Sequence, residues 1–544
     1  MIPCPALLRN TLGAMLARLR SAAVLGIDAY LVEVEVDLTN GLPYFATVGL
    51  PQGAVREGRE RVTGALVNAG FEFPLKRITV NLAPADVPKA GSAFDLPVAL
   101  GILAASGQLP AAALEGTVSF GELGLEGDLR PVRGALPMAL AARSGGARTL
   151  LVPAANVAEA AVVEGLSVHG AEHLRQVLWH LDGSAPMAPA PAVVHLGHSE
   201  ETIGGVDFAD VHGQLAAKRA LEVAAAGGHN VVLIGPPGAG KTMLARRLPT
   251  ILPSMTLEEA LEITKIHSVA GLLPGGSALI ATRPFRAPHH TISDAGLVGG
   301  GSSPRPGEVS LAHGGVLFLD ELPEFHRHVL EVLRQPMEDG QVTLSRAAAR
   351  LTFPARFTLM AAMNPCPCGH RGSPVHPCRC PAILVERYHA RISGPLLDRI
   401  DIHLSVPAVP YADLSGAPEA ESSAVIRARV EAARQRQRER FRKEPGVRAN
   451  AHMSSRVVRR YCRQSDEVGD ILKAAVERLG LSARGCHRVL KLARTIADLA
   501  AEDALAPAHV REAIQYRSLD RRPALSAGPE APGPSNPAGV SLPG

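Results

Sequence analysis

The chain has 544 residues, too many for a single ordinary core, so about two to four domains are expected. Hydrophobic residues make up 46% and charged residues 20%, a composition typical of a folded soluble protein. No apolar run reaches the roughly 18 residues of a membrane-spanning helix, so no membrane association is expected. The formal charge is only +4, so any binding of nucleic acid must come from local basic patches.

Seven cysteines without a regular framework favour a reducing, cytoplasmic compartment over secretion. The first 21 residues are basic and amphipathic, as in a targeting peptide, but they lack a continuous apolar segment and a clear cleavage site. We therefore interpret residues 1–14 as an N-terminal extension, with Met15 as an alternative start to Met1.

Strand-like runs such as YLVEVEVDL, RITVNLAP and TLLVP alternate with Ala/Leu-rich helical stretches over residues 15–182, the first predicted domain. Residues 183–199 are the expected linker, which opens with the Pro/Ala-rich segment 183–192. Residues 200–410 hold Gly-rich loops between short apolar strands, which predicts an α/β nucleotide-binding core. Residues 411–521 have helical spacing and many arginines, and residues 522–544 have the composition of a disordered tail.

The stretch NVVLIGPPGAGKTMLARRL reads as a strand, a loop and a helix, the context in which the motif G-x-x-x-x-G-K-[ST] binds phosphate. Small residues let backbone N–H groups approach the phosphates, Lys241 neutralises the β and γ oxygens, and Thr242 ligates Mg²⁺. ATP and Mg²⁺ are therefore the predicted cofactors. The remaining loop residues of the predicted site are Gly235, Pro236, Pro237, Gly238, Ala239 and Gly240.

Three further segments place polar side chains beside short apolar strands. GGVLFLDEL ends in Asp320, where an Mg²⁺-organising carboxylate is expected, and Glu321, which can orient or deprotonate the attacking water. ARFTLMAAMNP ends in Asn364, whose side chain can hold the same water. Arg399 precedes another strand and suits an arginine finger supplied to a neighbouring subunit, with a surface salt bridge as the alternative.

Longer runs resemble the AAA+ ATPases, and within them the magnesium-chelatase-like branch known as the ComM/YifB family. They are RPFRAPHHTISDAGLVGGG, RPGEVSLAHGGVLFLDELPEF, QPMEDGQVTLSRA, NPCPCG and RISGPLLDRIDIH. The resemblance covers nearly the whole chain from Met15 to about Arg521. It implies an AAA+ P-loop core with a helical lid, and it assigns sensor 2 to Arg484, with Arg488 as the competitor.

The segments PADVPKAGSAFDLPVALGIL and GELGLEGDLRPVRGALPMALAA resemble the proteolytic domain of Lon, a ribosomal S5 domain 2-like α/β fold. That protease needs a serine after a P-K-x-G-x turn and a lysine further on. Here Ala93 and Leu136 occupy those positions, and Lys89 with Ser92 is a makeshift alternative pair. We expect a domain without protease activity that serves as a scaffold or partner surface.

Four of the seven cysteines fall within NPCPCGHRGSPVHPCRC, which we read as an insertion at residues 364–381. Four thiolates from two Cys-x-Cys arms can satisfy a tetrahedral, structural Zn²⁺, and a histidine, His370 or His376, can replace one of them. The alternative is a set of free thiols in a tight Pro/Gly loop. The predicted ligands are Cys366, Cys368, Cys378 and Cys380.

A predicted hairpin, PMEDGQVTLSRAAARLTFPARF, occupies the place where related AAA+ helicases insert a hairpin into their central pore, and Arg346 and Arg350 are its candidate DNA contacts. The basic run RARVEAARQRQRERFRK is a weaker DNA candidate. The family resemblance implies a homo-hexameric helicase that moves branch points on single-stranded or branched DNA during homologous recombination and natural transformation. The alternative is a magnesium-chelatase-type ATPase that remodels a protein partner.

Overall fold

The computed structural model describes residues 16–191, 205–274, 276–301, 304–346, 349–372, 376–408 and 421–517. The N-terminal extension, the distal part of the linker and the predicted tail lie outside the described residues. The chain forms two compact units, each built from several segments. The first unit takes residues up to 205 with 254–319 and 324–358, and the second takes 206–253, 320–323 and the remainder.

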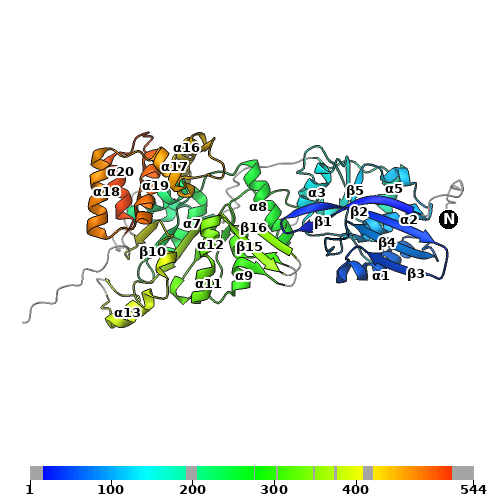
Figure 1. The fold of residues 1–544 in the computed structure, drawn as a ribbon, viewed down its shortest axis with the longest axis horizontal. Helices are drawn as coiled ribbons and strands as arrows, with labels where there is room; N and C mark the ends of the chain where they lie inside the picture. Colours follow the sequence, from blue (N-terminus) through cyan, green and yellow to red (C-terminus); the bar gives the residue numbers. More distant parts are fainter. Residues whose placement is uncertain are drawn as a thin grey trace, which may run out of the picture. The chain divides into compact units, whose positions relative to one another are not determined.

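A seven-stranded sheet with the strand order β3-β4-β2-β1-β5-β8-β9 organises the first unit (Figure 1, blue and cyan). β1 and β2 form a long antiparallel pair, in register from Leu16–Asp37 to Leu25–Asp28. β4 joins β2 antiparallel, while β3, β5, β8 and β9 make parallel pairs. The strands are β1 (Leu16–Leu25), β2 (Asp28–Thr39), β3 (Tyr44–Val48), β4 (Arg77–Ala83), β5 (Thr117–Ser119), β8 (Thr149–Pro153) and β9 (Ser167–Ala171).

Helices cover both faces of this sheet. Alternate residues Val32, Val34 and Val36 of β2 are fully buried in one core cluster, as the period-two spacing of a strand requires. On β8, Leu150 and Val152 belong to a second cluster and Leu151 to the first, so both faces are packed. The helices are α1 (Gly53–Asn68), α2 (Asp95–Ala105), α3 (Ala135–Ser144), α4 (Val157–Ala160) and α5 (Leu174–Leu181).

The first unit also contains residues 254–319 and 324–358. α8 begins at a capping box in which Thr256 and Glu259 bond each other's backbone N–H groups. β15 and β16 form an antiparallel hairpin, in register from Gln341–Pro354 to Arg346–Ala349. The main helices and strands of these two segments are α8 (Leu257–Ala270), β11 (Phe285–Arg286), α9 (Asp294–Val298), α10 (Glu308–Leu311), β14 (Val316–Leu319), α11 (Arg327–Val332), α12 (Arg334–Asp339), β15 (Gln341–Arg346) and β16 (Ala349–Pro354).

The five-stranded sheet has the order β11-β14-β17-β10-β18. In the second unit, β10 (Val231–Ile234) pairs parallel with β17 (Thr358–Met363) on one side and with β18 (Ile402–Ser405) on the other. The apolar side chains of β10 are almost entirely buried, as expected for a strand inside a parallel sheet. α6 (Leu215–Gly227) precedes β10, and the helices that follow these strands are α7 (Lys241–Ile251), α13 (Ala382–His389) and α14 (Gly394–Leu397).

Five helices form the lid at the C-terminal end of the described chain (Figure 1, yellow to red). Three of them begin at serines whose side chains accept a backbone N–H bond, a strong helix-start signal. The helices are α16 (Ser423–Phe441), α17 (Ser455–Tyr461), α18 (Asp466–Leu479), α19 (Ala483–Leu499) and α20 (Pro507–Gln515).

The predicted strands, the strand–loop–helix around the phosphate motif, the hairpin and the helical C-terminal block are all confirmed. One addition is β1, which includes residues that the sequence assigned to a basic amphipathic stretch. No helix among the described residues combines the length and the apolar character that crossing a membrane demands.

Candidate active site

The phosphate loop joins β10 to α7, and its glycines are required by geometry. A Cβ on Gly235 would lie 2.1 Å from the carbonyl oxygen of Val406, so no larger residue fits. Gly240 has φ of +81° and caps the N-terminus of α7, a conformation that glycine adopts without strain. The loop thus directs its backbone N–H groups and the positive end of the α7 dipole to one point, an anion site.

Lys241, the first residue of α7, folds back over the loop. Its Nζ donates to the carbonyl oxygens of Gly235 and Pro236 at 2.8 and 2.9 Å and to Oδ1 of Asn364 at 3.1 Å. Burial lowers the pKa of Lys241, while the nearby Asp320 and Glu321 act in the opposite direction. The ammonium group therefore gains from anionic ligands such as phosphate oxygens.

Thr242 and Asp320 come from different segments and meet directly. Thr242 Oγ1 donates to Oδ2 of Asp320 at 2.8 Å, and Oδ1 of Asp320 accepts the N–H of Glu321 at 2.9 Å. A hydroxyl and a carboxylate oxygen side by side are hard oxygen ligands of the kind Mg²⁺ takes, together with water and substrate phosphates. The residues therefore fit the predicted Mg²⁺ site.

A cavity of about 440 Å³ brings the predicted groups together. Glu321 has φ of +52°, which is uncommon outside glycine and is typical of constrained positions at functional sites. The cavity is lined by Pro237, Gly238, Ala239, Gly240, Lys241, Thr242, Met243, Asp320, Glu321, Met363 and Asn364.

Arg399 lies at the other end of the strands from the phosphate loop. It precedes β18, and its carbonyl oxygen accepts from Nδ2 of Asn230, the residue before β10. The four residues of β10 separate the two ends by roughly 13 Å. Arg399 is 8% exposed, with Nη1 donating to the carbonyl oxygen of Pro395 at 2.5 Å. It is therefore remote from the phosphate loop of its own chain.

The two sensor 2 candidates differ in their surroundings. Arg488 on α19 donates from Nη1 to Oδ1 of the buried Asp401 at 2.6 Å. Arg484, one turn earlier, is exposed, and within the described part of the chain no acceptor contacts it through a hydrogen bond. Arg488 thus joins α19 to the residue that precedes β18, whereas the side chain of Arg484 is exposed.

The four predicted cysteine ligands form one cluster. All four sulfur atoms lie within 4.8 Å of one another, and the cluster draws on both Cys-x-Cys arms. Sulfur–sulfur distances are 3.4 Å for Cys366–Cys368 and 3.7 Å from Cys378 to each of them. A tetrahedral Zn²⁺ with Zn–S bonds of about 2.3 Å separates its sulfurs by about 3.8 Å, so the donor set fits zinc.

Gln214 is a supporting residue that the sequence did not reveal. It precedes α6 with φ of +50°, and its Nε2 donates to the carbonyl oxygen of Ala239 in the phosphate loop at 2.8 Å. A single glutamine between two helical segments carries no motif, so only the fold shows its role.

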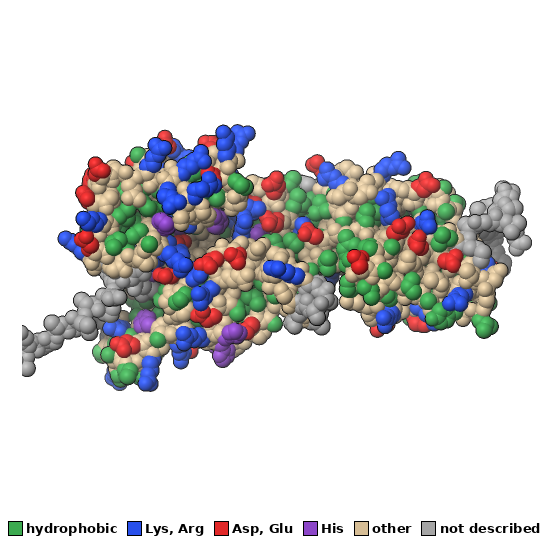
Figure 2. Space-filling model, viewed as in Figure 1, with side chains coloured by type: hydrophobic (Ala, Val, Ile, Leu, Met, Phe, Trp, Pro, Cys, Tyr) green, Lys and Arg blue, Asp and Glu red, His purple; other side chains and the backbone are tan. Residues whose placement is uncertain are grey.

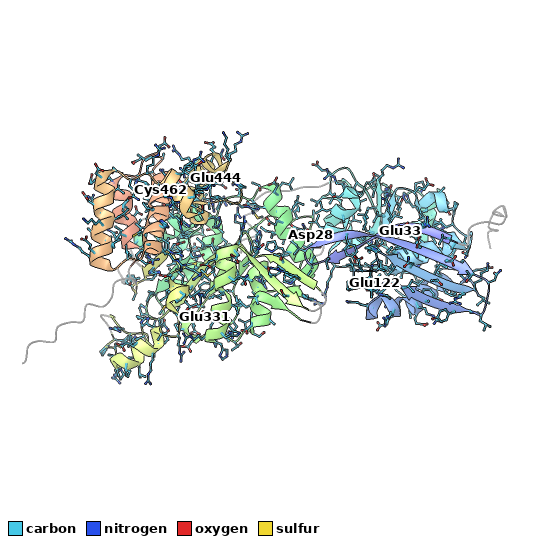
Figure 3. The ribbon with its side chains drawn as sticks, in the orientation of Figure 1. Asp28, Glu33, Glu122, Glu331, Glu444 and Cys462 are labelled. Carbon is cyan, nitrogen blue, oxygen red and sulfur yellow. The ribbon has the colours of Figure 1, made fainter. Side chains whose placement is uncertain are left out.

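The first domain shows no Ser–Lys pair at the protease position. Ser92 donates to a carboxylate oxygen of Glu122 (labelled in Figure 3), and Lys89 donates to the carbonyl oxygen of Pro84. Leu136 is fully buried in the core, and burial lowers the pKa of Lys89. Lys89 and Ser92 thus have separate partners.

Of the two arginines predicted to contact DNA, the structure describes the side chain of one. Arg350 is exposed on β16, opposite Ser345, whereas the side chain of Arg346 lies outside the described residues. In the basic run, Arg429 on α16 binds Glu421 and also Glu222 on α6, while Arg440 on α16 binds Asp498 on α19, so both arginines hold α16 to neighbouring helices.

Other basic side chains gather on the lid surface (Figure 2). On α17, Arg456 and Arg460 share Glu444, which is labelled in Figure 3. This sharing reduces the charge that α17 offers to a partner.

Family profiles match most of the chain. The profile of magnesium chelatase, subunit ChlI, matches residues 207–414, that of subunit ChlI of Mg-chelatase matches 34–156, and that of the ChlI C-terminal region matches 420–517. Together with the phosphate loop and the parallel sheet, these matches define an AAA+ ATPase of the magnesium-chelatase type.

Relatives that match over nearly their whole length identify the family within this class. The uncharacterized protein YifB of Salmonella typhimurium and the competence protein ComM of Haemophilus influenzae are each 46% identical, covering 93% of this chain and 98% of theirs. The chain belongs to the ComM/YifB family of magnesium-chelatase-like AAA+ proteins. Lon protease 2 of Bacillus subtilis is 34% identical over 161 residues, 27% of this chain and 28% of that protein. The predicted fold class is thereby confirmed.

Proposed function

We propose that the chain is an ATP-driven motor whose hydrolytic site is the cavity between the phosphate loop and Asn364. Two hydrogen bonds support this most. Lys241 donates to Asn364, and Thr242 donates to Asp320. Backbone N–H groups and Lys241 bind the phosphates, and Thr242 with Asp320 organises Mg²⁺. Glu321 and Asn364 orient the attacking water, and Arg484 reaches the γ-phosphate from the lid.

The active assembly is a homo-hexamer in the cytoplasm. Arg399 sits too far from its own phosphate loop to stabilise charge there, and it acts on the nucleotide of the adjacent subunit. The site is therefore complete only between two copies of the chain.

The substrate of the motor is single-stranded or branched DNA, which the motor moves during homologous recombination and natural transformation. The name of the relative ComM, a competence protein, supports this reading, as does the exposed Arg350 on the β15–β16 hairpin. Contacts through phosphates give weak sequence preference and steep salt dependence.

The cysteine cluster holds a structural Zn²⁺. Four sulfurs within 4.8 Å of one another supply a complete tetrahedral ligand set, and a closed Cys₄ site leaves no position for a reacting water.

A DNA titration of the ATPase activity tests the proposal. Purified full-length protein is expected to hydrolyse ATP faster as forked or three-stranded DNA is added, and the stimulation disappears at moderate salt. A magnesium-chelatase-type ATPase that remodels a protein partner remains the second candidate because of the profile matches. ATP turnover that is unaffected by DNA, with no DNA affinity even at low salt, would select it.

A further inference from the structure

The cysteine cluster lies next to the phosphate loop through a direct backbone contact. Gly369 follows the second ligand, Cys368, and it is buried with φ of +83°. A Cβ built on Gly369 would lie 2.6 Å from Cδ and 2.9 Å from Cγ of Pro237. The Gly369 backbone therefore packs on the ring of a phosphate-loop residue with no room for a side chain.

The same turn is tied to the site at its other end. Asn364, two residues before the ligand Cys366, accepts the hydrogen bond from Lys241 at 3.1 Å. Between them, the carbonyl oxygen of Pro365 contacts Nε2 of His389 at 3.1 Å. The turn itself closes through the N–H of Gly369, which donates to the carbonyl oxygen of Cys366 at 2.9 Å. One short turn thus contacts the nucleotide site at both of its ends.

We propose that metal bound by the four cysteines positions the phosphate loop and Asn364, so that nucleotide binding depends on the metal. This inference rests on the Zn²⁺ and ATP sites of the proposed function. The metal crosslinks two arms nine residues apart and fixes the left-handed turn at Gly369. Without it, the turn gains conformational freedom, and the contacts with Pro237 and Lys241 lose their support.

Two glycines of the same loop offer a matched pair of variants. Gly369 and Gly372 have φ of +83° and +78°, so alanine brings similar backbone strain at either position. They differ in their surroundings, because nothing lies within 4 Å of a Cβ built on Gly372. Gly369→Ala pushes on Pro237, whereas Gly372→Ala does not.

The test measures zinc content and the Kd of a fluorescent ATP analogue on full-length protein. Gly369→Ala is expected to keep one zinc per chain and to bind the analogue at least tenfold more weakly. Gly372→Ala should match the parent chain in both measurements. Unchanged analogue affinity in Gly369→Ala would overturn the inference.

A second pair of measurements starts from the metal. Removing zinc with a chelator, or by Cys378→Ser with Cys380→Ser, is expected to weaken analogue binding at least tenfold while circular dichroism shows a folded chain. Re-addition of Zn²⁺ to the chelated protein should restore binding. A chain that never binds zinc refutes the zinc site itself, and a zinc-free chain with unchanged affinity refutes only the coupling to the phosphate loop.

Discussion

Glu321 combines a strained backbone with a position in the cavity, and its carboxylate is expected to act on water alone. Glu321→Gln keeps Thr242 and Asp320, so it should bind ATP normally and lower turnover by at least about 100-fold. Steady-state ATPase rates and analogue binding measure the two effects. Glu324→Gln makes the same chemical change three residues away, outside the cavity lining, and should retain activity. Parental turnover in Glu321→Gln would exclude the assigned role.

Buried histidines make the second unit sensitive to acid. Burial lowers the pKa of His403 to about 3, so the folded chain keeps it neutral while the unfolded chain takes up a proton near pH 6.5. Stability is therefore complete above about pH 6.5 and falls as the pH drops, by roughly 2 kcal/mol between pH 6.5 and 5.

His403→Gln should remove this part of the acid sensitivity and reduce the fall in Tm from pH 7 to 5 by about 4–8 °C. Thermal unfolding at both pH values measures it, with His212→Gln at an exposed histidine as the control. Equal pH dependence in parent and His403→Gln would contradict a neutral buried imidazole.

At the scale of elements, α19 carries two arginines, one turn apart, with opposite expected roles. Burial alone would raise the pKa of Asp401, but the neighbouring Arg488 holds it below its usual range. Arg488→Ala leaves this buried carboxylate short of its partner and should cost about 3 kcal/mol of unfolding free energy. Arg484→Ala should leave stability unchanged and slow ATP turnover. Denaturant unfolding and ATPase rates, measured on both variants, distinguish the two roles. Slower ATP turnover in Arg488→Ala and a loss of stability in Arg484→Ala would assign sensor 2 to Arg488.

The β15–β16 hairpin is the element assigned to grip DNA. Arg346→Ala with Arg350→Ala should preserve basal ATPase activity and lose both DNA stimulation and strand displacement, because phosphate contacts are removed. Arg56→Ala with Arg59→Ala removes the same charge from exposed positions on α1 and serves as the control. If DNA still stimulates ATP hydrolysis in the hairpin variant, the DNA-binding residues lie elsewhere in the chain.

At the scale of the whole molecule, hydrolysis should require neighbouring subunits. Arg399→Ala is expected to bind ATP and not turn it over, and Lys241→Ala to bind none. Mixing the two inactive proteins should restore part of the activity, because some interfaces pair an intact Arg399 with an intact phosphate loop. Activity is measured across mixing ratios, and its absence at every ratio would mean that Arg399 acts within its own chain or only structurally.

The features that the sequence predicts are those encoded by neighbouring residues. The phosphate motif, the strand ends at Asp320 and Asn364, and the Cys-x-Cys arms are local patterns with a physical reason for their spacing. Contacts across long separations were not predictable, such as Gln214 with Ala239 and Gly369 with Pro237. The partner of Arg488 also required the fold, because Asp401 lies 87 residues away.

The order of the strands along the chain also sets the order in which the two sheets can be completed during synthesis. All seven strands of the first sheet lie within residues 16–171, so the ribosome releases them before the phosphate loop exists. β10 differs, because its partner β18 begins 168 residues beyond Ile234. At about 5–20 residues per second, translation needs about 8–34 s to cover that distance. Over that interval the nascent chain carries a finished first sheet and a phosphate-loop strand with two open edges until β17 is made, and with one open edge from then until β18 follows.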